Sequence, residues 1–139
     1  MILKGQIALI TGASSDIGRA VAEAMGREGA LVVVHYRNNR DGAQKVVEAI
    51  RLSGSEAIAV NAAVTVGGEI QEMVGAVRRQ WGRLDILVNN AGDLVAWQTL
   101  ADMTEDYWDQ VMALNLKSAF LCVKAVWEEM TARKAASSM

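Results

Sequence analysis

Hydrophobic residues gather in four short runs along the chain, at residues 6–10, 31–36, 56–60 and 85–89. Each run is rich in Val, Ile and Leu without a regular alternation of apolar and polar positions, which is typical of strands covered on both faces. Between the runs, apolar residues recur at helical spacing over Ile17 to Gly29 and at two further sets of positions: Ala43, Val46, Val47 and Ile50, and Ile70, Met73, Val74, Val77 and Trp81. The pattern predicts alternating strands and helices.

This order of elements predicts the α/β class, with a doubly wound parallel sheet of the Rossmann type and helices on both faces in three layers. Right-handed crossovers put the first two helices on one face and the third on the other, with strand order 3-2-1-4. The winding reverses between strands 1 and 4. A ligand crevice is therefore expected at that point, above Gly12 and Asn90.

Two more helices are expected after the fourth strand. Capping and acidic residues at 102–106 predict a helix that begins near Glu105, and a second helical stretch is expected from about Asn115 to Arg133. Between Ala119 and Trp127 only Lys124 is charged. A helix that is apolar nearly all round should be buried on more than one side, against its own sheet and against something else.

The length of 139 residues fits one domain. We expect it to cover 1–134, truncated after the helix that follows the fourth strand, with a frayed tail over 135–139. The chain has 14 basic and 16 acidic side chains and a net charge of -2, so no long-range field would attract nucleic acid or anionic lipid. No apolar run is long enough to span a bilayer, and a strand follows Lys4 without a signal-peptide pattern. A cytoplasmic location without membrane contact is expected.

Cys122 and His35 are each the only residue of their kind. A lone cysteine excludes an internal disulfide, and the apolar surroundings of Cys122 predict a buried, unreactive side chain. A lone histidine with scattered carboxylates does not support a metal site. We interpret His35 as a polar residue at the end of a strand.

The segment Thr11 to Gly18 is the strongest chemical signal in the sequence, because it joins the first apolar strand to the first helix through a glycine-bearing turn. Such a turn brings backbone N–H groups and the positive end of the helix dipole to one point, which binds phosphate. A second segment, Asp85 to Gly92, ends another apolar strand in small residues. A flat ligand can lie against such a strand end. Together the two segments predict one dinucleotide site.

These motifs resemble the short-chain dehydrogenase/reductases, especially their 3-oxoacyl-(acyl carrier protein) reductase-like and glucose dehydrogenase-like branches. Thr-Gly-x-x-x-x-x-Gly after the first strand, Leu84 to Gly92 at the fourth, and Val111 to Leu116 on a later helix stand in the family's order and spacing. The resemblance runs from Gly5 to about Met130 and matches the N-terminal portion of the family. It implies an NAD(P)-dependent oxidoreductase that reduces a small carbonyl or oxidises an alcohol by hydride transfer, and a homo-oligomer formed through the 115–133 helix.

The resemblance also implies roles for individual residues. It gives the cofactor-binding set as Gly12, Ser14, Ser15, Asp16, Ile17, Gly18, Arg37, Asn38, Val64, Asn90, Ala91 and Gly92. Within this set the turn holds the phosphates, Asn90 to Gly92 line the nicotinamide ribose, and Val64 packs on the adenine. Asn89 matches the residue that braces the strand ends. Asn115 matches the helix asparagine that supports a water in the proton relay, and it is the catalytic candidate.

Two departures from the family pattern affect cofactor binding. Asp16 replaces the middle glycine of the turn and brings a carboxylate toward a diphosphate, at a cost of roughly 3 kcal/mol for a separation of ~5 Å and an effective dielectric near 20. An outward-pointing Asp16 that caps backbone N–H groups would lessen this cost, and Asp tolerates a left-handed backbone. Ala63 stands where the family has an acidic residue on the adenine amino group, so that hydrogen bond is absent.

A third departure concerns catalysis. The family uses a tyrosine with a lysine four residues on, together with a serine. Here Tyr36 is followed at that spacing by Arg40, and Tyr107 by Val111, so neither tyrosine fits. No apolar strand precedes Ser137-Ser138 as the serine motif requires. We therefore expect a catalytically incomplete chain that carries the cofactor-binding part. The alternative is a non-catalytic nucleotide-binding module or a self-associating interaction fragment.

The end of the second strand bears on cofactor choice. An acidic residue there would bind the ribose 2′-hydroxyl of NAD, but the chain has Arg37 and Asn38. A guanidinium can meet a 2′-phosphate with two hydrogen bonds, so NADP is preferred over NAD. Structural roles are the alternatives for three of these residues: Arg37 as a solvated loop charge, Gly18 as a close-packing residue and Asn89 as a strand-end hydrogen-bonding residue.

Overall fold

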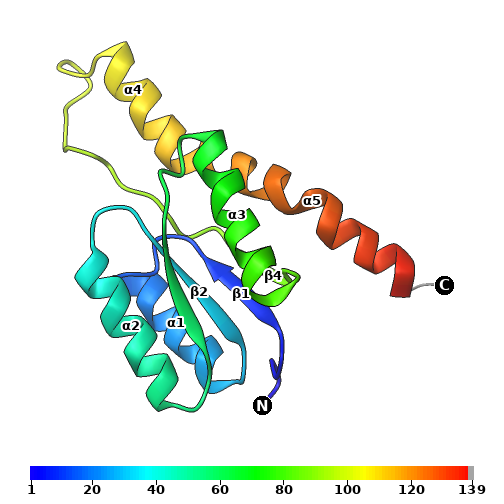
Figure 1. The fold of residues 1–139 in the computed structure, drawn as a ribbon. Helices are drawn as coiled ribbons and strands as arrows, with labels where there is room; N and C mark the ends of the chain where they lie inside the picture. The colour runs from blue at the N-terminus through cyan, green and yellow to red at the C-terminus, as the bar shows by residue number, and fades with distance from the viewer. Residues whose placement is uncertain (138–139) are drawn as a thin grey trace.

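The computed structural model describes residues 1–137, with side chains as far as Ala132. Its elements, in chain order, are β1 (Ile7–Ile10), α1 (Asp16–Arg27), β2 (Leu31–Tyr36), α2 (Arg40–Leu52), β3 (Ala57–Asn61), α3 (Gly67–Trp81), β4 (Ile86–Val88), α4 (Glu105–Met112), the π-helix η1 (Ala113–Lys117) and α5 (Ser118–Ser137). The strands lie within one or two residues of the predicted runs. Figure 1 shows their arrangement.

The sheet has the predicted order, β3-β2-β1-β4, and every neighbouring pair of strands is parallel. In β1, Leu9 stands opposite Val33 of β2 and Leu87 of β4. All four residues of β1 are buried, as expected for a central strand whose two faces are both covered. The α/β class and the Rossmann-type topology are therefore confirmed.

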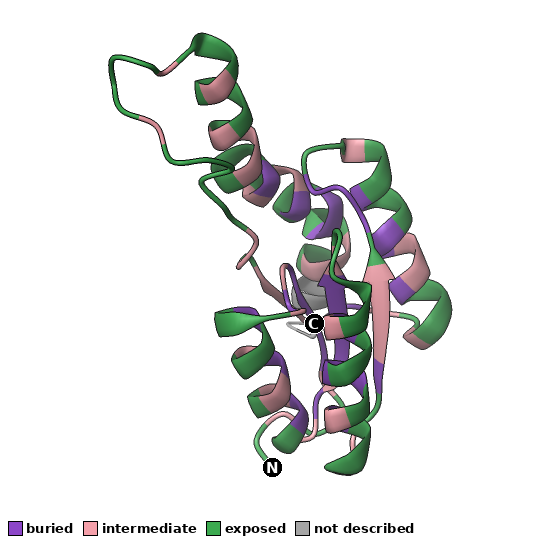
Figure 2. Cartoon of the chain, turned by 90° about the vertical axis from the view of Figure 1, so that its left-hand side faces the viewer, coloured by how far each residue is buried: buried purple, intermediate pink, exposed green. Residues whose placement is uncertain are grey.

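Successive residues of the central strands point into two separate cores. Ile7 and Leu9 of β1 pack with α3 and α5 on one face of the sheet. Ala8 and Ile10 pack with α1 and α2 on the other. This alternation follows from the two-residue period of a strand, and it produces the three predicted layers (Figure 1). In Figure 2 the buried residues concentrate in the strands and the facing sides of the helices.

The region after β4 departs from the prediction of a helix starting at Asn115. Thr104 caps α4 by accepting a hydrogen bond from the Tyr107 N–H, as its sequence signal predicted. The next turn is a π-helix over Ala113–Lys117, in which the Ser118 N–H bonds to the Ala113 carbonyl five residues back. The backbone of α5 is helical to Ser137, and the last two residues of the predicted tail, 138–139, lie outside the described residues.

One side of α5 is buried, and the other is open to solvent in the single chain. Cys122 and Val126 pack into the core beside α3, and burial raises the pKa of the Cys122 thiol to about 11, in keeping with an unreactive side chain. Phe120 and Trp127 are 60% and 61% exposed. The expected burial of α5 on a second side is thus not met within the chain.

Among the residues whose side chains the structure describes, 1–132, none forms a helix with the length and apolar character of a membrane span.

We expect Ile50→Ala to lower the free energy of unfolding by about 2–5 kcal/mol, because the side chain is 1% exposed and fills the core between α2 and the sheet. Leu52→Ala, two residues on and 90% exposed, should change it by less than about 0.5 kcal/mol. Urea denaturation followed by circular dichroism measures both. Equal losses in the two variants would contradict the assignment of this core.

Candidate functional site

A cleft of about 470 Å³ opens at the carboxyl edge of the sheet, at the point where the strand order reverses. It is lined by Gly12, Ser14, Ser15, Asp16, Ile17, His35, Tyr36, Arg37, Asn38, Asn39, Asn90, Ala91, Gly92, Asp93 and Leu114. Ten of the twelve residues predicted to bind cofactor are among them. Segments that follow β1, β2 and β4 therefore meet at one place.

The β1–α1 turn presents the amino end of α1 to this cleft. Gly12 and Asp16 both have left-handed backbone, with φ of 62° and 52°. Ser15 is the N-cap of α1 but makes no side-chain capping hydrogen bond. The Asp16 carboxylate makes no hydrogen bond among the described residues, so the cap proposed for it is absent. The first-turn N–H groups, which lack helical partners by geometry, stay available to a ligand.

Asn90 ties the end of β4 to the end of β1. Its side-chain amide donates to the Thr11 carbonyl at 3.1 Å and to the Gly12 carbonyl at 3.0 Å. The Thr11 hydroxyl accepts from the backbone N–H groups of Asn90 and Ala91. Asn89 is exposed and has no part in this network. The bracing role predicted for Asn89 is wrong and belongs to Asn90, because successive residues of an extended segment point to opposite sides.

Gly18 lies against this network rather than on the cleft lining. A Cβ at Gly18 would overlap the Gly12 carbonyl and lie 2.5 Å from the Asn90 amide nitrogen. The structural alternative raised for Gly18, close packing of the helix on the strand end, is therefore what the structure has. The absence of a side chain lets α1 begin at the edge of the sheet.

His35 is a site residue that the sequence interpretation missed. Its side chain is 2% exposed and forms part of the cleft. Nδ1 accepts from the Gly12 N–H at 2.9 Å, and Nε2 lies 2.8 Å from the Ala62 carbonyl oxygen. Burial lowers the pKa of His35, opposed in part by the hydrogen bond to Ala62. No sequence signal identifies these partners, which lie 23 and 27 residues away.

Arg37 and Asn38 line the cleft where β2 ends. The side-chain amide of Asn61, the last residue of β3, donates to the Arg37 carbonyl at 2.6 Å and to the Tyr36 carbonyl at 3.3 Å. Asn61 thereby fixes the backbone that carries Arg37. Arg37 and Asn38, the two residues predicted to bind near the adenosine ribose, therefore lie on the same wall of the cleft.

Asn115 sits in the π-helix and clamps the chain just after β4. Its amide oxygen accepts from the Asp93 N–H at 3.1 Å, and its amide nitrogen donates to the Asp93 and Val111 carbonyls. A Cβ at Gly92 would come 2.5 Å from that oxygen. The side chain of Asn115 is thus engaged with the backbone beside the cleft and is not part of its lining.

Val64 is the other predicted residue that the structure keeps off the cleft. It is 4% exposed and packs in the core formed with α3. Next to it, the Ala63 N–H donates to the Glu69 carboxylate at 3.1 Å. The Tyr107 hydroxyl, on α4, donates to the carbonyls of Leu94 and Ala96 and so connects α4 to the loop that precedes it.

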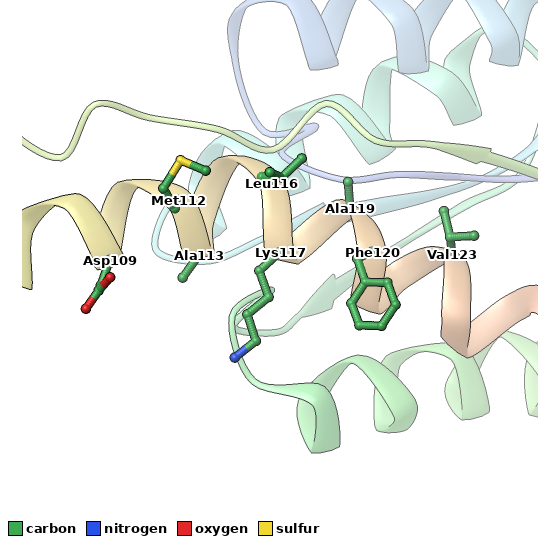
Figure 3. A pocket seen from close by; sticks show the side chains of 8 residues that line it. All are labelled: Asp109, Met112, Ala113, Leu116, Lys117, Ala119, Phe120 and Val123. Carbon is green, nitrogen blue, oxygen red and sulfur yellow. The ribbon is translucent and has the colours of Figure 1, made fainter.

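A second hollow, of about 720 Å³, lies along α4, η1 and α5 (Figure 3). Its lining is mostly apolar and includes Met112, Leu116, Phe120 and Val123. It is built from helix sides, so it offers neither a helix amino end nor free backbone amides to a phosphate. This surface suits contact with another apolar surface better than a charged nucleotide.

Comparison with known proteins agrees with this geometry. A family model described as short chain dehydrogenase matches residues 6–137. The chain is 38% identical to trihydroxynaphthalene reductase of Colletotrichum orbiculare over 92% of its length and 45% of the relative's. It is 43% identical to the 3-oxoacyl-[acyl-carrier-protein] reductase FabG of Staphylococcus epidermidis, over 88% of its length and 50% of the relative's.

Solved structures that resemble the chain are also reductases of this kind. The chain superposes on an NADH-dependent reductase, A1-R′, complexed with NAD, with a TM-score of 0.90 and 30% identity over 99% of this chain and 57% of that one. A short-chain dehydrogenase/reductase mutant of Serratia marcescens gives a TM-score of 0.88 at 31% identity, over 94% and 53% of the two chains. The chain spans about half the length of the curated relatives it matches.

We expect Gly18→Ala to lower the free energy of unfolding by about 1–3 kcal/mol, because the added methyl group overlaps the Gly12 carbonyl. Gly68→Ala is the matched control. Gly68 has nothing within 4 Å of an added Cβ, so alanine there should leave stability within about 1 kcal/mol of wild type. Thermal unfolding measures both variants. Wild-type stability in Gly18→Ala would contradict the close approach.

Proposed function

Because the chain belongs to the short-chain dehydrogenase family, we propose that its cleft binds a nicotinamide dinucleotide, with NADP preferred over NAD. The bound cofactor serves an oxidoreductase reaction that interconverts a carbonyl compound and an alcohol. The observation that carries this proposal is the convergence of the β1–α1 turn, Arg37 and the residues after β4 on one cleft.

The donor set of the cleft fits the phosphates of such a ligand. The first-turn N–H groups of α1 and the hydroxyls of Ser14 and Ser15 supply donors, and the helix dipole favours negative charge. Asp16 is the misfit, because its carboxylate repels a diphosphate. Its exposure to water weakens that repulsion. The proposal therefore includes binding, at an affinity below that of a chain with glycine at this position.

The two ends of the dinucleotide take different walls of the cleft in this proposal. Arg37 and Asn38 bind the adenosine ribose and its 2′-phosphate, supported by the position of Arg37 on the lining and by Asn61 behind it. Asn90, Ala91 and Gly92 lie beside the nicotinamide ribose. We propose that Val64 contacts the adenine from the core that it forms with α3, where its side chain is 4% exposed.

The chemistry divides between the cofactor and the protein. When bound, the nicotinamide ring would supply or accept the hydride. Asn115 contributes by holding the Asp93 backbone at the edge of the cleft and by supporting a water for proton transfer. Neither tyrosine is followed by a lysine four residues on. We propose that the cleft residues and Asn115 bind and orient the cofactor. Proton transfer then needs a group other than Tyr36 and Tyr107.

A second candidate function, self-association, is favoured by the exposed side of η1 and α5. Leu116, Phe120 and Trp127 are 61%, 60% and 61% exposed, and the first two line the apolar hollow of Figure 3. Contiguous exposed apolar side chains of this size mark an interaction surface. A second copy of the chain is the proposed occupant, packed through the helices over 115–133.

We expect Arg37→Ala to raise the Kd for NADPH by about 10- to 100-fold and to change the Kd for NADH by less than about threefold, because only NADPH carries the 2′-phosphate that a charged hydrogen bond would hold. Titration calorimetry gives both constants. Arg79→Ala, in the last turn of α3, is the control and should bind both nucleotides as wild type does. No saturable binding of either nucleotide to the wild-type chain would refute the proposed function.

We expect Phe120→Glu to shift the chain toward the monomer, because the charge would have to be desolvated in the contact between copies. Light scattering at micromolar concentration should report a dimer or larger assembly for wild type. Leu52→Glu, on the outer end of α2 and 90% exposed, should keep the wild-type size. A wild-type chain that is monomeric under these conditions would rule out self-association through α5.

A further inference from the structure

We propose that His35 is a positioning residue for the phosphate-binding turn, acting as a neutral imidazole that holds Gly12, and that its protonation weakens dinucleotide binding as the pH falls. The effect on binding rests on the function proposed above. The positioning role rests on the contacts of His35 alone and can be tested without a ligand.

His35 holds the turn at two successive amides. The Gly12 N–H donates to its ring, and the Ala13 N–H donates to its backbone carbonyl at 2.9 Å. On the far side, the ring reaches the carbonyl of Ala62, just past the end of β3. One residue of β2 therefore connects the turn that follows β1 to the end of β3, on the lining of the cleft that contains the proposed phosphate site.

These contacts admit one protonation state. The Ala62 carbonyl can only accept a hydrogen bond, so Nε2 must carry a hydrogen. The Gly12 N–H can only donate, so Nδ1 must present its lone pair. A proton on Nδ1 would set two donors against each other at 2.9 Å in a buried position. The turn would have to move away from the ring for the imidazolium to form.

No neighbouring charge offsets that conflict. Charged groups that share the cleft lining with His35 are Asp16 on α1, Arg37 after β2 and Asp93 after β4, and Glu69 on α3 accepts from the Ala63 N–H next to Ala62. Within residues 1–132, none of them is hydrogen-bonded to the imidazole. Burial is the main cause that lowers the pKa of His35, and a buried imidazolium without a carboxylate partner is unfavourable.

The direction of the pH effect follows from linkage. If the dinucleotide binds only the chain with neutral His35, lowering the pH reduces the fraction of protein in that form and raises the apparent Kd. The loss begins below the ordinary histidine pKa of about 6.5, because the folded-state pKa is lowered. Above that range the histidine contributes no pH dependence.

The ring itself can be read directly, because His35 is the only histidine in the chain. Long-range ¹H–¹⁵N NMR of the free protein should show a single neutral ring protonated at Nε2 at pH 7.5. The Gly12 amide signal should shift together with the ring as His35 titrates. A ring protonated at Nδ1, or a charged ring at pH 7.5, would overturn the positioning role whatever the chain binds.

Two variants separate the ring's contacts. His35→Asn keeps an acceptor near the position of Nδ1, and His35→Gln keeps a donor near the position of Nε2. We expect the Kd for NAD⁺ at pH 7.5 to stay within about threefold of wild type in His35→Asn and to rise about tenfold in His35→Gln. NAD⁺ is the probe because it lacks the 2′-phosphate, which titrates near pH 6 itself.

The pH profile then decides the inference. As the pH is lowered from 7.5 through the titration of His35 seen by NMR, the Kd of wild type should rise several-fold more than that of His35→Asn, whose side chain does not titrate. Parallel profiles in the two proteins would refute control of binding by His35. If the wild-type chain binds neither NAD⁺ nor NADPH at pH 7.5 while NMR finds the Nε2–H ring coupled to Gly12, the proposed function fails and the positioning role holds.

Discussion

The close approach of α1 to the strand ends is the constraint on which the site depends. Gly18 lacks a Cβ, so its backbone can lie against the Gly12 carbonyl and the Asn90 amide. Asn90 in turn binds the carbonyls of Thr11 and Gly12. With these carbonyls occupied, the amino end of α1 is held at the carboxyl edge of the sheet. The unpaired N–H groups and the dipole of the helix then act on the cleft.

Single polar side chains do the work of strand pairing beyond the sheet. Where parallel strands end, their backbone groups lose ladder partners and need others. Asn90 donates to the backbone just after β1, and Asn61 donates to the backbone just after β2. The His35 ring bonds to the turn after β1 and to the carbonyl just after β3. Each of these side chains reaches across to another strand. The cleft walls are thereby arranged before any ligand enters, which lowers the ordering cost of binding.

The sequence predicts the fold and most of the residues that line the cleft, because both depend on local signals. Apolar periodicity and the handedness of crossovers are enough for the strand order, and the glycine turn identifies the end of β1. Long-range polar partners leave no such trace. His35 bonds to residues 23 and 27 positions away, and the choice between Asn89 and Asn90 depends on which side each faces. The π-turn at Ala113–Lys117 changes backbone pairing without changing the apolar pattern, so the sequence predicted a second helix from about Asn115 and not the π-turn itself.

The position of Asp16 has two requirements: a left-handed backbone and no negative charge near a phosphate. Glycine would meet both, whereas aspartate meets only the first. At φ 52° the position needs a residue that tolerates left-handed backbone, and aspartate does so better than most. The left-handed backbone of the turn is therefore compatible with aspartate at this position. The charge is a different matter, since the carboxylate shares the cleft with Arg37 and the positive end of α1. Because Asp16 is exposed, water and salt screen its repulsion of a phosphate more than they weaken a partly enclosed amide donor. For the proposed nucleotide, Asp16 would therefore affect affinity through its charge and not through backbone geometry.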